Sequence, residues 1–155
     1  RSVCTQCGFI HYINPKVVVG CIPEKEDGRI LLCKRNIEPR KGFWTLPAGF
    51  LEDKESVQDG AVRETLEETR AKVEIISPYR LFNITFVSQI YFIFRARLRS
   101  EAFGPTKEST EVRLFEESEI PWDSIAFRVI EETLKHYFND RQKGKDFSFE
   151  VCDLI

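Results

Sequence analysis

The sequence predicts an α/β fold in which a mixed β-sheet lies between helices. Two apolar segments, residues 16–22 and 29–34, have the composition of paired strands. A charged helical segment at residues 56–70 separates them from later strand patterns, and an amphipathic helical segment follows at residues 124–138. Because strands and helices interleave along the chain, we expect them to pack in layers around a shared core.

Length and composition limit the classes of protein to consider. The chain has 155 residues, of which 42% are hydrophobic, which is enough for one domain with a substantial core. Its net charge of −2 produces no strong field, so we expect neither nucleic acid nor a membrane as a partner. No apolar run reaches the roughly 18 residues that a membrane span needs.

The N-terminal residues 1–13 carry a pair of cysteines. Cys4 and Cys7, followed by Gly8, form half of a zinc knuckle. A structural zinc site usually needs four ligands, so we interpret this segment as the remnant of a zinc-binding unit whose second pair would lie upstream. A redox-active or inert pair is the alternative, and the main domain is expected at residues 14–155.

The chain begins at Arg1 and contains no methionine. We therefore interpret it as a processed chain or as a piece of a longer one, in which a targeting segment would not be visible. The expected location is the cytoplasm, or an organelle stroma if a transit segment was removed.

The first two predicted strands are joined by residues 24–28, whose Asp-Gly sequence favours a hairpin turn. Cys21 and Cys33 lie within these apolar strands and are expected in the core. The polar loop at residues 35–42 supplies Arg35 and Arg40 as candidate phosphate contacts, with solvated loop cations as the alternative.

Residues 44–50 form a short apolar segment that ends in a glycine turn, and the helix at residues 56–70 follows it. Ser56 can cap this helix, with Asp59 three residues later. Spacings of three and four place three glutamates on one face. The residues expected on the opposite, core-facing side are Gln58, Val62, Thr65, Leu66 and Thr69.

Glu64, Glu67 and Glu68 would repel one another, which destabilises a helix unless a cation offsets the charge. Magnesium is typically held by carboxylates and substrate phosphates, so these side chains are candidate metal ligands. A solvated acidic helix face is the alternative for any such cluster considered alone.

The remainder of the chain predicts further strands and a second helix. Pro78 separates two of these strands, and the helix carries apolar side chains at helical spacing. A last strand is expected at the edge of the sheet. The predicted strands are residues 72–77, 79–85, 88–98, 111–115 and 147–151.

The segment from Gly49 to Glu68 resembles the signature of a known family. Gly49, five residues, Glu55, seven residues, Arg63-Glu64, two residues and Glu67-Glu68 match the Nudix box, and Leu46-Pro47-Ala48 before it strengthens the match. Two positions differ: Thr65 replaces an aliphatic residue, and Arg70 replaces the glycine that closes the helix. A left-handed cap disfavours a residue with a side chain, which makes the end of the helix uncertain.

The resemblance covers roughly residues 14–140 and implies an α/β/α sandwich that hydrolyses a nucleoside diphosphate derivative with Mg²⁺ or Mn²⁺. It implies that Glu64, Glu67 and Glu68 bind the metal, with a backbone carbonyl of Ala48 or Gly49 completing the shell. Arg63 would orient a glutamate by ion pairing. Glu55 would support the loop or a metal-bound water.

The resemblance implies a general base near the attacking water, supplied by the helix or by a loop between late strands. That loop offers Glu108 and Glu111, of which Glu111 is favoured, and an ordinary surface acid is the alternative role of each. Phe82, Phe86 or Tyr91 could stack on adenine, although core packing is the alternative role of each aromatic side chain.

The cysteine pair is followed by Asn-Pro-Lys at residues 14–16, Val-Val-Gly-Cys at 18–21 and Leu-Leu-Cys-Lys-Arg at 31–35. This combination is similar to the zinc-ribbon-bearing branch that cleaves ADP-ribose or FAD. We therefore expect one of these substrates, with release of AMP. Relatives of that branch are commonly homodimers. No Ser-Gln-Pro-Trp-Pro-Phe-Pro run, typical of members that cleave NADH, follows Ala71.

Other functions stay open on the same fold. One is an enzyme that removes oxidised nucleoside triphosphates, and another is a prenyl diphosphate isomerase, which would need Cys21 or Cys33 to face the pocket. A third is a ligand-sensing module without catalytic activity. Because such sensors often lose a carboxylate of the box and this chain keeps them all, the sequence favours catalysis.

Overall fold

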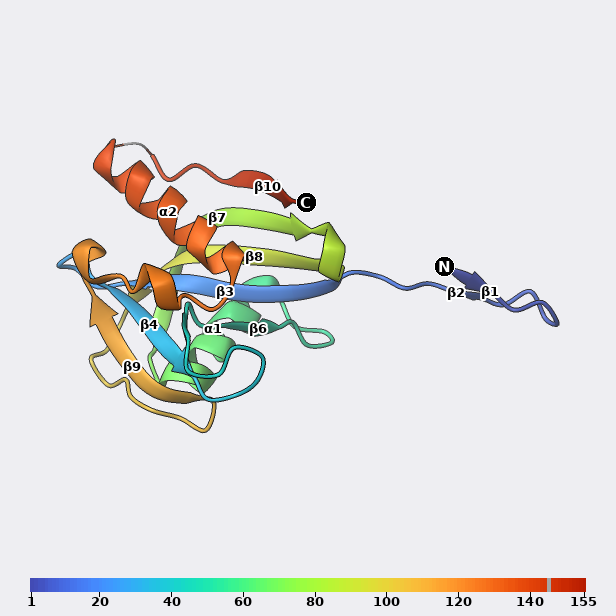
Figure 1. Cartoon of the computed structure of the whole chain (residues 1–155), viewed down its shortest axis with the longest axis horizontal. Helices are drawn as coiled ribbons and strands as arrows, with labels where there is room; N and C mark the ends of the chain where they lie inside the picture. The colour runs from blue at the N-terminus through green and yellow to red at the C-terminus, as the bar shows by residue number, and fades with distance from the viewer. Residues whose placement is uncertain (145) are drawn as a thin grey trace.

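The computed structural model describes residues 1–144 and 146–155, and it confirms the mixed sheet between helices (Figure 1). The strands of the main sheet lie in the order β10-β7-β8-β3-β4-β5, with β6 paired to β3 and β9 to β4. The pairs β3–β8 and β7–β10 are parallel, and the others are antiparallel. The elements are β1 (Ser2–Val3), β2 (Ile10–His11), β3 (Lys16–Glu24), β4 (Ile30–Arg35), β5 (Trp44–Thr45), β6 (Ala48–Phe50), α1 (Val57–Thr69), β7 (Val73–Ile84), β8 (Gln89–Leu98), β9 (Ser109–Phe115), α2 (Arg128–Gln142) and β10 (Glu150–Leu154).

Strand β3 lies at the centre of the sheet, and its side chains alternate between two cores. Val19 and Cys21 pack with Ala61 of α1 in the smaller core. Ile22 packs with Ile130 and other residues of α2 in the larger core. Since successive side chains of a strand point to opposite faces, α1 and α2 cover opposite faces of the sheet.

The predicted hairpin between β3 and β4 forms at its turn and then opens. The nitrogen of Lys25 donates to the carbonyl of Arg29 over 2.8 Å, but Glu24 and Ile30 are the one residue pair in register between the two strands. Strand β6 pairs with β3 from Val18 to Gly20 instead. This insertion brings the glycine turn to the middle of the sheet, directly beside α1.

Helix α1 begins as its local sequence predicts, and the structure defines its end, which the sequence left uncertain. The Ser56 hydroxyl accepts a hydrogen bond from the Asp59 nitrogen at 3.1 Å, so the cap is confirmed. The helix ends at Thr69, and Arg70 adopts the left-handed conformation with φ 62°. A residue with a side chain therefore takes the place of the usual glycine, at a cost of roughly 1–2 kcal/mol.

The prediction for the core-facing side of α1 was partly wrong. Thr65 and Thr69 are fully buried, but Leu66 is 45% exposed. Glu64 and Glu68 are buried with Thr65 and Thr69 instead. The helix contacts both β3 and β6, so the side that carries two of the glutamates faces the glycine turn rather than solvent.

Three predicted boundaries also change. Residues 72–77 and 79–85 form one strand, β7, whose register shifts on both sides of Pro78, where a proline without an N–H is tolerated. Helix α2 begins at Arg128 rather than at Ser124, because residues 122–124 form a 3₁₀ turn. The edge strand predicted at residues 147–151 lies at residues 150–154.

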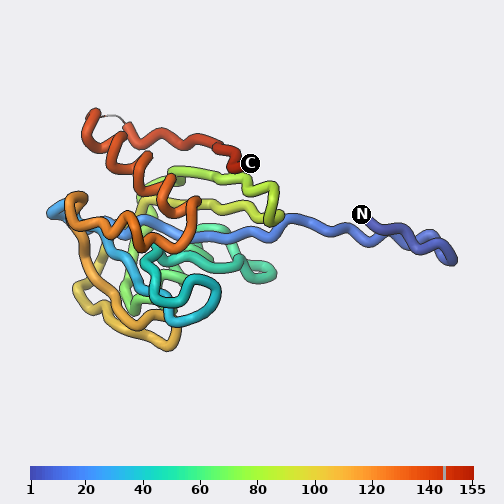
Figure 2. The backbone as a smooth tube through the Cα atoms, viewed as in Figure 1, coloured from blue at the N-terminus to red at the C-terminus, as the bar shows by residue number. Residues whose placement is uncertain are grey.

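The N-terminal arm projects away from the body (Figure 2). Residues 1–16 are all exposed, and β1 and β2 pair only with each other. Within the described residues, no three histidine, cysteine or acidic side chains stand together as a metal site, so the zinc expected at Cys4 and Cys7 has no support here. None of the described helices is both long and apolar enough to cross a membrane.

We expect the cysteines to differ strongly in reactivity. Cys4 and Cys7 are exposed, and the backbone N–H of Cys7 lowers the pKa of Cys4. Burial raises the pKa of Cys21 to about 12 and that of Cys33 well above its usual range. Because the thiolate is the nucleophile, iodoacetamide should label Cys4 and Cys7 in the native protein and leave Cys21 and Cys33 unlabelled. Peptide mass spectrometry before and after unfolding measures this, and fast native labelling of Cys33 would contradict its buried placement.

Candidate active site

A cavity of about 770 Å³ lies where the acidic side of α1 meets the glycine turn, the ends of β7 and β8, and the start of α2. Its size is within the range of pockets that bind small ligands. Many of the predicted site residues line it, and these are Arg35, Gly49, Arg63, Glu64, Glu67, Glu68 and Tyr91.

Arg63 organises the acidic wall of this cavity. Its Nε and Nη2 donate to the two carboxylate oxygens of Glu55 at 2.7 and 2.9 Å. Its Nη1 donates to Glu64 at 2.7 Å and to Glu67 at 3.2 Å, and its Nη2 also donates to the Phe50 carbonyl at 3.1 Å. The guanidinium thus ties the loop to the helix and lowers the pKa of Glu55 to about 2.

Two of the three carboxylates have lost most of their contact with water. Glu64 is 8% exposed and Glu68 is 5% exposed. Burial raises the pKa of Glu64 and raises that of Glu68 to about 8, although the Ala48 nitrogen donates to Glu68 Oε2 at 3.0 Å. Ionised carboxylates in such surroundings are costly without a cationic partner, and Arg63 supplies one to Glu64 but none to Glu68.

The glycine at position 49 allows the turn to approach these carboxylates. A methyl group on Gly49 would overlap the Glu64 carboxylate, so a larger residue would displace one or the other. This close approach brings the backbone of the turn next to the carboxylates. A metal ion held by both the carboxylates and a backbone carbonyl, as predicted, would need the two to be neighbours.

The residues present suit a hard divalent cation, because carboxylate and carbonyl oxygens are the ligands that Mg²⁺ prefers. As the side chains are placed, however, no group of three acids among the described residues converges to hold a metal, and Glu64 and Glu67 share the Arg63 guanidinium instead. Exposed Glu67 can turn toward a cation without a change in the backbone, since 51% of its side chain is accessible.

The structure places the two candidates for the general base differently. Glu111 lies on β9 opposite Lys34, forms an ion pair with it at 3.0 Å, and does not line the cavity. Glu108 lines the cavity instead. Its loop is held in place because Thr106 donates to the Glu68 carbonyl at 3.3 Å and the Asn36 nitrogen donates to the Glu108 carbonyl at 2.8 Å.

Some of the residues predicted to contact the ligand line the cavity, and others do not. Phe82 is 1% exposed and packs in the larger core against His136 of α2, so its role in stacking on adenine was wrong. Tyr91 does line the cavity, as does Phe86, which is 67% exposed. The Arg40 guanidinium lies over Phe43 and its Nε donates to the Ala126 carbonyl, which places it outside the cavity lining.

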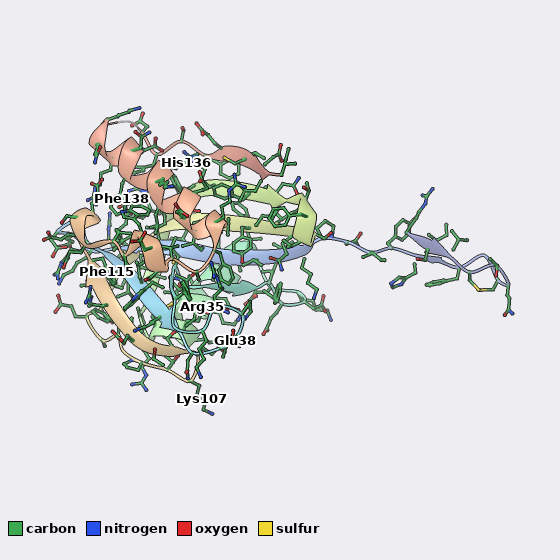
Figure 3. All side chains as sticks on the ribbon, in the orientation of Figure 1. Arg35, Glu38, Lys107, Phe115, His136 and Phe138 are labelled. Carbon is green, nitrogen blue, oxygen red and sulfur yellow. The ribbon has the colours of Figure 1, made fainter. Side chains whose placement is uncertain are left out.

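Arg35, labelled in Figure 3, stands at the end of β4, where its Nε donates to the Pro39 carbonyl at 2.8 Å. Its guanidinium lies 4.9 Å from the centre of the Phe127 ring, which also lines the cavity. Sequence reasoning missed Phe127, and it also missed Gln89, Arg128 and Leu154. No sequence signal connects these four residues, since they come from β8, from the N-cap and first residue of α2, and from β10.

The NUDIX domain family model matches residues 14–134, and the chain therefore belongs to the NUDIX family, as the signature predicted. A NUDIX hydrolase from Nitrosomonas europaea has 52% identical residues, and the superposition covers 98% of this chain and 85% of that structure with a TM-score of 0.92.

Two curated relatives of this chain carry names that describe different substrates for those proteins. An ADP-ribose pyrophosphatase from Methanocaldococcus jannaschii is 50% identical over 37% of this chain and 34% of its own length. A protein named NAD-capped RNA hydrolase NudC from Vibrio parahaemolyticus is 30% identical over 88% of this chain and 54% of its own length. The chain thus spans between about a third and a half of these two relatives.

Proposed function

We propose that this protein hydrolyses the phosphoanhydride bond of a nucleoside diphosphate derivative, with ADP-ribose or FAD as substrate, and releases AMP. The observation that carries this proposal is that Glu64, Glu67 and Glu68 line one cavity, where Arg63 forms ion pairs with Glu64 and Glu67. The 50% identity to an ADP-ribose pyrophosphatase over 37% of this chain supports this choice.

Each residue of the wall has a role in this reaction. Glu64, Glu67 and Glu68 would hold Mg²⁺ or Mn²⁺, which when bound supplies charge neutralisation on the diphosphate and acidifies a water. Arg63 keeps Glu64 and Glu67 oriented, and Glu55 holds Arg63 in turn. Arg35 at the rim offers a cation to the phosphate groups.

A screen of substrates tests the proposal. The protein is incubated with Mg²⁺ or Mn²⁺ and, separately, ADP-ribose, FAD, NADH, diadenosine polyphosphates or oxidised nucleoside triphosphates, and AMP and other products are separated by chromatography. We expect AMP from ADP-ribose or FAD. If no diphosphate compound is consumed with either metal, the proposal is wrong.

The screen also separates two alternatives. Cleavage of NADH in preference to ADP-ribose and FAD would favour a nicotinamide dinucleotide as substrate, of the kind that the name of the Vibrio relative suggests. Release of pyrophosphate from oxidised nucleoside triphosphates would favour the sanitising function.

The two candidate bases allow a matched comparison. We expect Glu108→Gln to lower kcat by about two to four orders of magnitude, the usual contribution of a general base. Glu111→Gln should leave kcat within about twofold of the original, because Glu111 pairs with Lys34 on the neighbouring strand and does not line the cavity. Steady-state kinetics with the substrate found in the screen measures both, and the reverse order of effects would restore Glu111 as the base.

A further inference from the structure

One residue that lines the cavity lies outside the segment that the family model matches. The family match ends at residue 134, whereas Leu154 of β10 lines the cavity. We infer that β10 is a specificity element, in which Leu154 forms part of the surface that receives the nucleobase of the substrate. This inference deepens the proposed function and rests on it for the identity of the ligand.

The register of the sheet explains how Leu154 reaches the cavity. Strand β10 runs parallel to β7, and Leu154 lies directly opposite Ile84. Both side chains line the cavity, and they are only 7% and 5% exposed. Ile84 and Leu154 are thus well packed, and a ligand in the cavity can contact their exposed edges without a rearrangement of the core.

A buried arginine fixes β10 in this position. Arg80 of β7 is 2% exposed, and its Nη1 donates to the Ser148 carbonyl at 2.8 Å, just before the strand begins. Its Nη2 donates to Asp140 of α2 at 3.1 Å and lies 3.5 Å from the Glu150 carboxylate. Arg80 therefore connects β7, α2 and β10, and the strand is held at its entry as well as along its ladder.

The chemistry of the cavity decides which part of the substrate meets Leu154. The acidic wall with its cation site suits the diphosphate. Of the lining residues, Leu154, Ile84 and Val129 belong to one buried apolar cluster, and Phe127 packs against it. A planar base can bury its faces against these apolar side chains, whereas a ribose has no comparable apolar face.

Two ligands that differ in the base test this assignment. The Kd of AMP and that of ribose 5-phosphate are measured by calorimetry in Mg²⁺ for the full chain and for Leu154→Trp. We expect the larger side chain to fill the space of the base, so that AMP binds at least about tenfold more weakly, which corresponds to about 1.4 kcal/mol. Ribose 5-phosphate should bind equally to both proteins.

The same strand provides the control. Val151 is 65% exposed and does not line the cavity, so Val151→Trp should leave both Kd values unchanged. If Leu154→Trp does not fold, as judged by its melting curve, Leu154→Ala replaces it and should weaken AMP binding by a smaller factor through loss of contact.

Three outcomes would overturn the assignment. These are an unchanged AMP Kd in the folded Leu154 variant, an equal loss for ribose 5-phosphate, and an original chain that binds no AMP. The proposed function fails separately, because it fails when no diphosphate compound is hydrolysed, even if AMP binding depends on Leu154.

Discussion

Replacing Glu67 or Glu68 by glutamine is expected to lower kcat by at least about two orders of magnitude, as removal of a group that stabilises transition-state charge typically does. Glutamine keeps the shape of the side chain and removes the negative charge. At position 68 the amide oxygen can still accept the hydrogen bond from the Ala48 nitrogen, so the fold of the turn should persist. Initial rates at saturating substrate and metal measure the effect.

Glu111→Gln provides the matched control, since it removes one carboxylate from the neighbouring β9 strand and leaves the cavity untouched. Melting temperatures of all three variants should agree within a few degrees. Near-normal turnover in both Glu67→Gln and Glu68→Gln would count against the metal assignment, even if the protein hydrolyses the proposed substrate.

The second large effect is expected from Gly49→Ala. The added methyl group would overlap the Glu64 carboxylate. That carboxylate has little freedom to move, because it is 8% exposed and accepts a 2.7 Å hydrogen bond from Arg63. A displacement of about 1 Å at such a site can cost on the order of 100-fold in rate, so we expect kcat to fall by about that factor.

Gly104→Ala is the control for this variant. A methyl group at position 104 would meet no atom within 4 Å, and kcat should stay unchanged. Calorimetric titration with Mn²⁺ distinguishes the cause, because Gly49→Ala should bind the metal more weakly while Gly104→Ala binds it normally. Normal metal affinity and normal turnover in Gly49→Ala would show that Glu64 relaxes without consequence.

Features that depend on neighbours in the chain were predicted well. The Ser56 cap is a contact between residues three apart, and the chain spacing of Glu64, Glu67 and Glu68 defines their shared side of α1 whatever the helix packs against. The resemblance implied that Arg63 pairs with a glutamate, and the structure shows pairs with Glu55 and Glu64 of the same short segment.

Features that depend on distant segments were predicted poorly. Glu108 and Glu111 differ by three residues and have the same chemistry, but one lines the cavity and the other pairs with Lys34, because the β9 ladder begins between them. Phe82 and Tyr91 are opposite each other in the β7–β8 ladder, and only one reaches the cavity. The pattern of aromatic residues is the same for a core position and a ligand contact.

The sequence by itself determined the acidic helix, its N-terminal cap, the glycine before it and the alternation of strands and helices. These follow from spacing, backbone conformation and hydrophobic periodicity, which act over a few residues. Only the tertiary structure decided that β6 inserts beside β3, that Glu64 and Glu68 are buried, and that Leu154 lines the cavity. The physical reason is that burial and sheet register arise from contacts between segments far apart in the chain, which no local pattern encodes.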